Sequence, residues 1–170
     1  MIDTSNIYQI LKKHNLRNCV PFDIEQLSEI LGVSFSYKLT YKDKVHAFSN
    51  EDNTAVISSL LIESRLHLYI KAYTLYFAAN NIKQNVTLQD MKKDARSHPD
   101  IYKANCFAES ILMPEHLIIQ EGKRFIPKEK KWFFFKKKIK QSDFIVLMAE
   151  RFKVDEYIME NRLRQLNILK

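Results

Sequence analysis

The chain has 170 residues, of which 46% are hydrophobic and 28% are charged, and this length favours one domain with its own hydrophobic core. It contains only two glycines, Gly32 and Gly122, so it cannot hold a P-loop, a GxGxxG dinucleotide turn or a GxSxG elbow, each of which needs several glycines close together. The formal net charge is +7, but residues 123–140 hold nine lysines and arginines and one acid, so the rest of the chain is close to neutral.

The first third of the chain predicts two helices and a small meander of strands. Apolar residues at helical spacing predict a helix over residues 5–14. A second helix follows Asp23, a candidate N-cap, and ends at Gly32. Alternating apolar residues predict a half-buried strand over residues 33–39, and the stretches KVHAFS and TAVISS predict two further short strands with a polar turn between them.

The remainder of the chain predicts helices. Residues 62–80 lack a helix breaker and are apolar almost all round, which is typical of a helix buried on most of its surface. The polar residues 81–100 predict a loop, and residues 102–113 predict a helix that ends before a proline. After the basic segment, two short helices with Ser142 and Asp155 as N-caps close the chain.

The number of cysteines and the length of the apolar runs indicate where in the cell this protein is expected. Two cysteines, Cys19 and Cys106, are too few for a four-thiolate zinc site or a disulfide framework, and we expect free thiols, with Cys106 a buried small hydrophobe. No apolar run approaches the ~20 residues that span a bilayer, and the N-terminus does not resemble a signal peptide. These features predict a cytoplasmic protein.

The histidines give no local zinc motif. The five are His14, His46, His67, His98 and His116. No two stand four residues apart, so no helix presents the His-x-x-x-His pair that grips zinc from one face. Scattered histidines are mostly surface or hydrogen-bonded core residues.

One stretch resembles a known family. The pattern AnxFAxxxLMP is formed by Ala104, Asn105, Phe107, Ala108, Leu112, Met113 and Pro114. With the C-terminal LMAERFKVDEYIMENRLRQLNIL, the early FDIEQLSEILGV and the TAVISS strand before a long helix, it resembles the ImmA/IrrE family of zinc metallopeptidases over roughly residues 5–169. The resemblance implies one α+β domain over residues 1–170, mostly helical with a small antiparallel β-sheet and a zincin-like (gluzincin) fold.

The residues of the family's zinc site are absent from this sequence. The resemblance places the family's A-H-E-x-x-H motif on the long helix, with Tyr73 and Phe77 where the two histidines would bind zinc and Thr74 where the glutamate would activate water. The third ligand position falls on Ile101 or Lys103, depending on register. None of these residues can do this work, and the simplest interpretation is that they are core residues. We therefore expect the fold without the HExxH motif, no cofactor and no peptidase activity.

The basic-aromatic segment, residues 123–140, is the conspicuous positive feature. Its candidate partner-binding residues are Lys130, Lys131, Trp132, Phe134, Lys136, Lys137 and Lys138. Lysines beside aromatic rings suit nucleic acid, an acidic protein or an anionic membrane surface; alternatively, the rings pack on the core and the lysines form a solvated rim. The two C-terminal helices also resemble a helix-turn-helix, but Asp155, Glu156 and Glu160 would repel phosphates, so we do not expect them to read DNA.

Three hypotheses for function follow. The leading one is a catalytically inactive domain that regulates a protein partner, a helix-turn-helix repressor of phage or mobile-element type as the resemblance implies, and binds it in the former substrate groove. The second is a nucleic-acid-binding module that uses residues 123–140. The third is a peptidase with displaced catalytic residues, for which His67 and Cys106 are the candidates.

Overall fold

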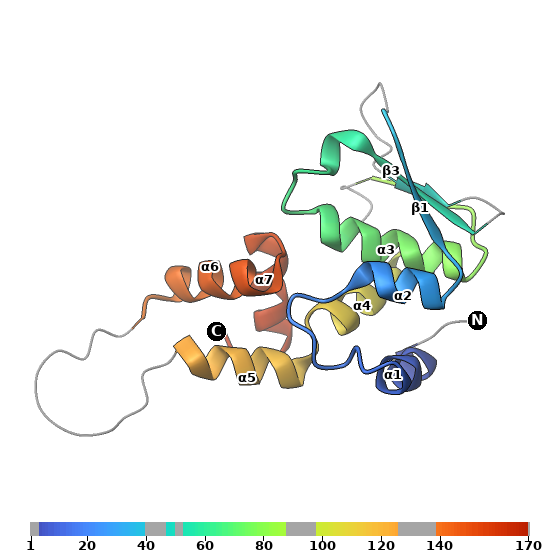
Figure 1. Ribbon diagram of the computed structural model, residues 1–170. Helices are drawn as coiled ribbons and strands as arrows, with labels where there is room; N and C mark the ends of the chain where they lie inside the picture. The colour runs from blue at the N-terminus through green and yellow to red at the C-terminus, as the bar shows by residue number, and fades with distance from the viewer. Residues whose placement is uncertain (1–3, 40–46, 50–52, 88–97, 126–138, 170) are drawn as a thin grey trace, which may run out of the picture.

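The computed structural model describes residues 4–39, 47–49, 53–87, 98–125 and 139–169. This part of the chain is mostly helical, with seven α-helices and one small sheet, which confirms the α+β class (Figure 1). The helices are α1 (Thr4–Lys13), α2 (Ile24–Ile30), α3 (His67–Ala79), α4 (Pro99–Leu112), α5 (Glu115–Phe125), α6 (Gln141–Phe152) and α7 (Glu156–Gln165). The strands are β1 (Ser34–Lys38), β2 (Ala47–Ser49), β3 (Thr54–Ser58) and β4 (Asn85–Val86).

The sheet has the strand order β1-β3-β2-β4 and is mixed. β1 pairs with β3 in parallel, whereas β2 is antiparallel to both β3 and β4. The expectation of an antiparallel meander is therefore wrong. The physical reason is the burial of β3: Ala55, Val56 and Ile57 are all buried, so this apolar strand takes a central place and the half-exposed β1 is left at the edge.

Helix α3 lies at the centre of the fold, as its apolar sequence predicted. Every residue from Tyr69 to Ala78 is buried, and the helix packs on β3 and β2 on one side and on α4 on the other. It begins at His67 instead of at residue 62, because residues 59–61 form a 3-10 helix and the chain turns again before α3. Helix α4 ends at Leu112, before Pro114, which confirms that prediction.

The structure confirms two of the three predicted helix N-caps. The Asp23 carboxylate accepts a hydrogen bond from Gln26 N at 3.0 Å, and the Asp155 carboxylate accepts one from Tyr157 N at 2.9 Å, so both predicted N-caps are confirmed. The predicted Ser142 cap is wrong, because α6 begins at Gln141 with Lys140 at its N-cap, and the Ser142 hydroxyl lies 3.2 Å from Asp143 Oδ1. Helix α5 and strand β4 were not predicted.

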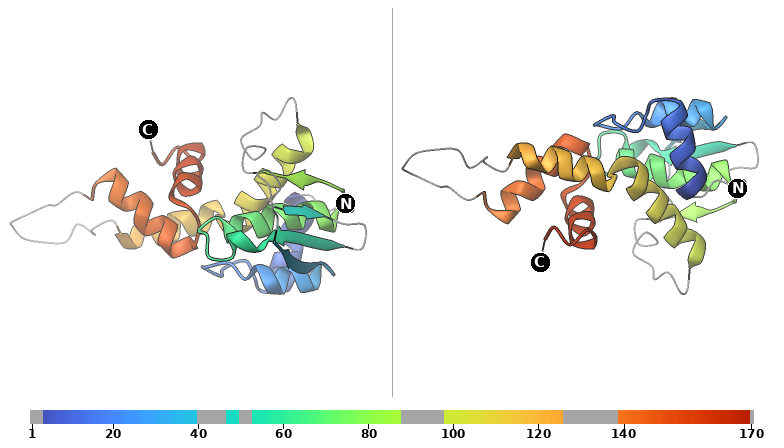
Figure 2. Two further views of the ribbon diagram at one scale, coloured as in Figure 1. Left: turned by 90° about the horizontal axis from the view of Figure 1, so that it is seen from above. Right: turned by 90° about the horizontal axis from the view of Figure 1, so that it is seen from below.

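The core is continuous across the molecule. One cluster of buried apolar residues contains side chains from all seven helices and from β3. The sheet lies toward one end, and α5 and α6 lie side by side at the other (Figure 2). Among the described residues, no helix has the length and apolar character needed to cross a membrane.

Candidate functional site: a groove between α3, α4 and α7

All but one of the positions that the resemblance assigns to the zinc site lie inside the core. The side chains of Tyr73, Thr74 and Phe77 are fully buried, and the rings of Tyr73 and Phe77 meet edge to face with their centroids 5.4 Å apart. Ile101 is buried in the same cluster, whereas Lys103 lies on the surface, 3.6 Å from the Asp100 carboxylate. The structure thus buries four of the five residues at the expected zinc-site positions and leaves Lys103 on the surface.

Nothing in this neighbourhood resembles a metal site. Within the part of the chain that the structure describes, no group of three or more His, Cys, Asp or Glu side chains could hold a metal ion. The hydroxyl of Thr74, at the position of the family's glutamate, forms no hydrogen bond with any described residue. The aromatic rings of Tyr73 and Phe77 belong instead to the buried apolar cluster.

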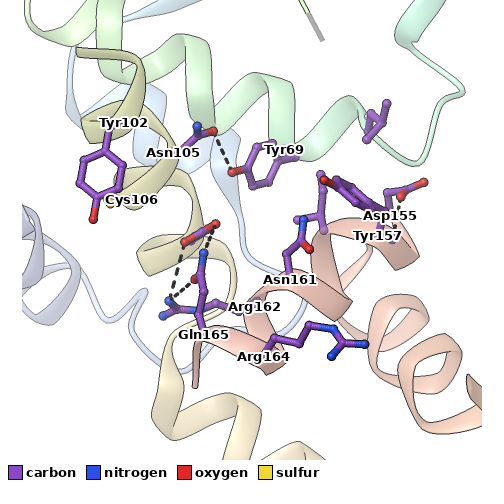
Figure 3. Close-up of a pocket in the computed structure, with 13 residues that line it drawn as sticks. Tyr69, Tyr102, Asn105, Cys106, Asp155, Tyr157, Asn161, Arg162, Arg164 and Gln165 are labelled. Atoms are coloured by element: carbon purple, nitrogen blue, oxygen red, sulfur yellow. Dashed lines mark hydrogen bonds and ion pairs between the residues drawn. The ribbon is translucent and has the colours of Figure 1, made fainter. Parts of the chain in front are cut away.

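A groove of about 910 Å³ opens one helical turn away from these positions (Figure 3). The start of α3 contributes Leu66 and Tyr69 to it. Its two walls are helix faces: α4 contributes Tyr102, Asn105, Cys106 and Glu109, and α7 contributes chiefly Ile158, Asn161, Arg162 and Gln165. The groove therefore lies between the beginning of the buried helix and the C-terminal helix, which are distant in sequence.

A hydrogen-bond network fixes the polar part of the groove. The Tyr69 hydroxyl donates to Asn105 Oδ1 at 3.1 Å, and burial raises the pKa of Tyr69. Gln165 Nε2 donates to Glu109 Oε1 at 3.2 Å, and the Arg162 guanidinium lies 3.8 Å from the same carboxylate. Burial raises the pKa of Glu109, while Arg162 and Gln165 act in the opposite direction.

The open side of the groove carries exposed aromatic rings. Tyr102 is 51% exposed and Tyr157 is 53% exposed, so both rings are available for contact. Cys106 lies on the α4 wall, one turn after Tyr102, and is half-buried, so the expectation of a buried cysteine is wrong. Exposed tyrosines over an ordered polar floor are typical of protein-recognition surfaces.

A second cluster of ionisable side chains surrounds the start of α3, and the sequence analysis did not identify it. The buried ammonium group of Lys71 pairs with the carboxylate of Glu25 and lies 4.6 Å from the centre of the Phe35 ring. The Tyr37 hydroxyl and His67 Nε2 share a hydrogen bond at 3.1 Å. Burial, assisted by the charge of Lys71, lowers the pKa of His67.

This cluster predicts a measurable pH dependence. Because the pKa of His67 is below its ordinary value of 6.5 in the folded chain, the stability it contributes is present above pH 6.5 and is lost as the pH falls through the lowered pKa. Glu109 acts oppositely, since its raised pKa adds stability as the pH falls. We therefore expect His67→Gln to lose less stability than the parent chain on acidification below pH 6.5, measured by urea unfolding. Parallel pH profiles for the two proteins would contradict this assignment.

Helices α5 and α6, which flank the basic-aromatic segment, are joined by a buried carboxylate. Glu121 is 2% exposed, and its Oε2 accepts from Arg124 of α5 at 2.8 Å and from Arg151 of α6 at 2.6 Å. The predicted partner-binding residues lie outside the described residues: Lys130, Lys131, Trp132, Phe134, Lys136, Lys137 and Lys138. Glu121 thus holds together α5 and α6, the described helices that precede and follow these residues.

Two acidic side chains of the C-terminal helix α7 are paired with arginines of the same chain. Lys153 joins α6 to α7 in the left-handed conformation, with φ 57°, at the place where the pattern would have a glycine. Glu156 pairs with Arg65 at 2.8 Å, and Glu160 pairs with Arg164 at 2.6 Å. One face of α7, which includes Ile158, Asn161 and Arg162, forms a wall of the groove.

Comparison with known proteins adds no family to this description. No protein-family model matches the chain, and no curated protein matches it in sequence. The groove between α3, α4 and α7 is therefore the feature on which a functional proposal has to rest.

Proposed function

We propose that this chain is a non-catalytic, ImmA/IrrE-like domain that binds and regulates a protein, a helix-turn-helix repressor of phage or mobile-element type, through the groove between α3, α4 and α7. The observation that carries the proposal is the groove itself, with exposed Tyr102 and Tyr157 beside the ordered Tyr69–Asn105 and Glu109–Gln165 contacts. The identity of the partner comes from the sequence resemblance alone.

The proposal that the domain is non-catalytic is supported by the packing of α3. Tyr73 and Phe77 are parts of the core and contact each other, so the fold depends on the side chains that replaced the expected ligands. A binding surface can persist without a metal, because the fold and the chemistry depend on different residues. If each chain held one zinc ion tightly, and a chelator removed both the zinc and a peptidase activity, this proposal would be contradicted.

Site-specific photo-crosslinking tests the groove directly. A benzoylphenylalanine in place of Tyr157 is expected to crosslink a helix-turn-helix protein in the native host, identified by mass spectrometry. The matched control carries the same group in place of Tyr8, which is 45% exposed on α1, away from the groove. Equal crosslinking at both positions, or a partner at position 157 of another class, would contradict the proposal.

A second candidate function uses the basic-aromatic segment. Its nine basic residues against one acid, together with Trp132 and its neighbouring phenylalanines, favour single-stranded nucleic acid. On this alternative, Lys136→Gln/Lys137→Gln is expected to reduce the slope of log K against log salt by about 1.4, because each phosphate contact contributes about 0.7. The control Lys12→Gln/Lys13→Gln removes the same charge from α1 and should leave the slope unchanged. Equal slopes for both variants would remove this candidate.

A further inference from the structure

We propose that the groove holds a helix of the partner protein, and that the side chains this helix turns into the groove are uncharged. This inference deepens the proposed function and rests on it. It follows from two independent features of the groove: the spacing of the residues on its walls and the pairing of its charges.

The walls have the geometry that receives a helix. Tyr102, Asn105 and Cys106, and Glu109 stand at positions i, i+3 and i+4, and i+7 of α4, so one face of α4 runs along the groove for two turns. Ile158, Asn161 and Arg162, and Gln165 repeat this spacing on α7. Two helix faces with a trough between them offer ridges and grooves on both sides to a third helix.

The charges of the groove are already engaged within the chain. Four charged residues are among the described residues that line it: Glu109, Asp155, Arg162 and Arg164. Glu109 and Arg162 face each other at 3.8 Å, and Arg162 Nε also donates to the Met113 carbonyl at 3.1 Å. Arg164 pairs with Glu160, and Asp155 caps α7.

This pairing decides the chemistry of the occupant. A charged side chain entering the groove would lose its hydration and would meet charges that already have partners, which is unfavourable. Aliphatic and aromatic side chains can instead cover Leu66, Ile158 and the tyrosine rings. Amide and hydroxyl groups can exchange hydrogen bonds with Asn161 and its neighbours. The best fit is thus an amphipathic helix with a neutral contact face.

Selection from a peptide library tests this inference and requires no identified partner. The probe is a library of peptides displayed on a fixed helical scaffold, with the contact face randomised over all residues. The bait is the full chain, and the counter-bait is Tyr157→Asp, which puts a charge at the groove but suits the first turn of α7. We expect enriched helices to present aliphatic, aromatic and amide side chains and to bind Tyr157→Asp about tenfold more weakly.

Salt and a matched variant complete the test. Affinity should change less than about twofold between about 50 and 500 mM NaCl, because no new ion pair forms. Tyr8→Asp, a charge on exposed α1, should bind like the parent chain. Enrichment of charged contact faces, a steep salt dependence or the absence of any helix sensitive to Tyr157→Asp would overturn the inference. If position 157 nevertheless crosslinks a repressor, the proposed function stands and only the helical, neutral occupant is rejected.

Discussion

Replacement of Phe77 by alanine is expected to lower the free energy of unfolding by about 3–5 kcal/mol. The Phe77 side chain is fully buried, and its ring contacts those of Tyr73 and Tyr76 with centroid separations of 5.4 and 5.6 Å. Its removal leaves a cavity at the centre of α3, which packs on both the sheet and α4. Urea unfolding of the purified variant, followed by circular dichroism, measures the loss.

The control is Leu60→Ala, because Leu60 is 70% exposed and its truncation should change stability by no more than about 0.5 kcal/mol. A loss of less than about 1 kcal/mol for Phe77→Ala would mean that the position tolerates a cavity. In that case the assignment of Phe77 to the tightly packed core would fail.

Removing both arginines from Glu121 is expected to cost about 3–5 kcal/mol, because an uncompensated charge would remain buried. The Arg124→Met/Arg151→Met variant leaves the 2%-exposed carboxylate without its two cations. Each single variant keeps one cation and should lose less than half of that amount. Denaturant unfolding of the three proteins checks this order.

A third substitution separates charge from packing. Adding Glu121→Met to the double arginine variant removes the buried carboxylate and should restore most of the stability, since apolar replacements of a buried ion pair are often neutral. If the triple variant stays as unstable as the double one, the arginines act through the packing of their methylene groups and the electrostatic account of the α5–α6 contact is wrong.

Local chemistry made part of the fold predictable. Asp23 and Asp155 were identifiable as caps because an aspartate before an apolar periodic run satisfies free helix N–H groups. Helix α3 was identifiable because its residues are apolar on every side, and the end of α4 because a proline follows. Each of these signals lies within a few residues of the structure that it specifies.

Other features depend on contacts between distant residues. The parallel pairing of β1 with β3 depends on which strand takes the central place in the sheet. Helix α5 was not predicted, because charged and polar residues surround its buried Leu117 and Ile118 in the sequence. The groove needs α3, α4 and α7 to meet, and its polar floor joins Glu109 to Gln165 across 56 positions of sequence. No short sequence pattern encodes contacts between helices so far apart in the chain. The residues that line the groove could therefore not be predicted from the sequence.

The contacts of Glu121 affect which changes of sequence the protein can tolerate in evolution. Glu121 of α5 binds Arg151 near the C-terminal end of α6, so the helices before and after residues 126–140 are held together by a contact that does not involve those residues. Closing a loop costs only about 0.6 kcal/mol more for each doubling of its length. Changes of length between these two helices are therefore expected to cost little free energy and to leave the α5–α6 contact and the groove unaltered.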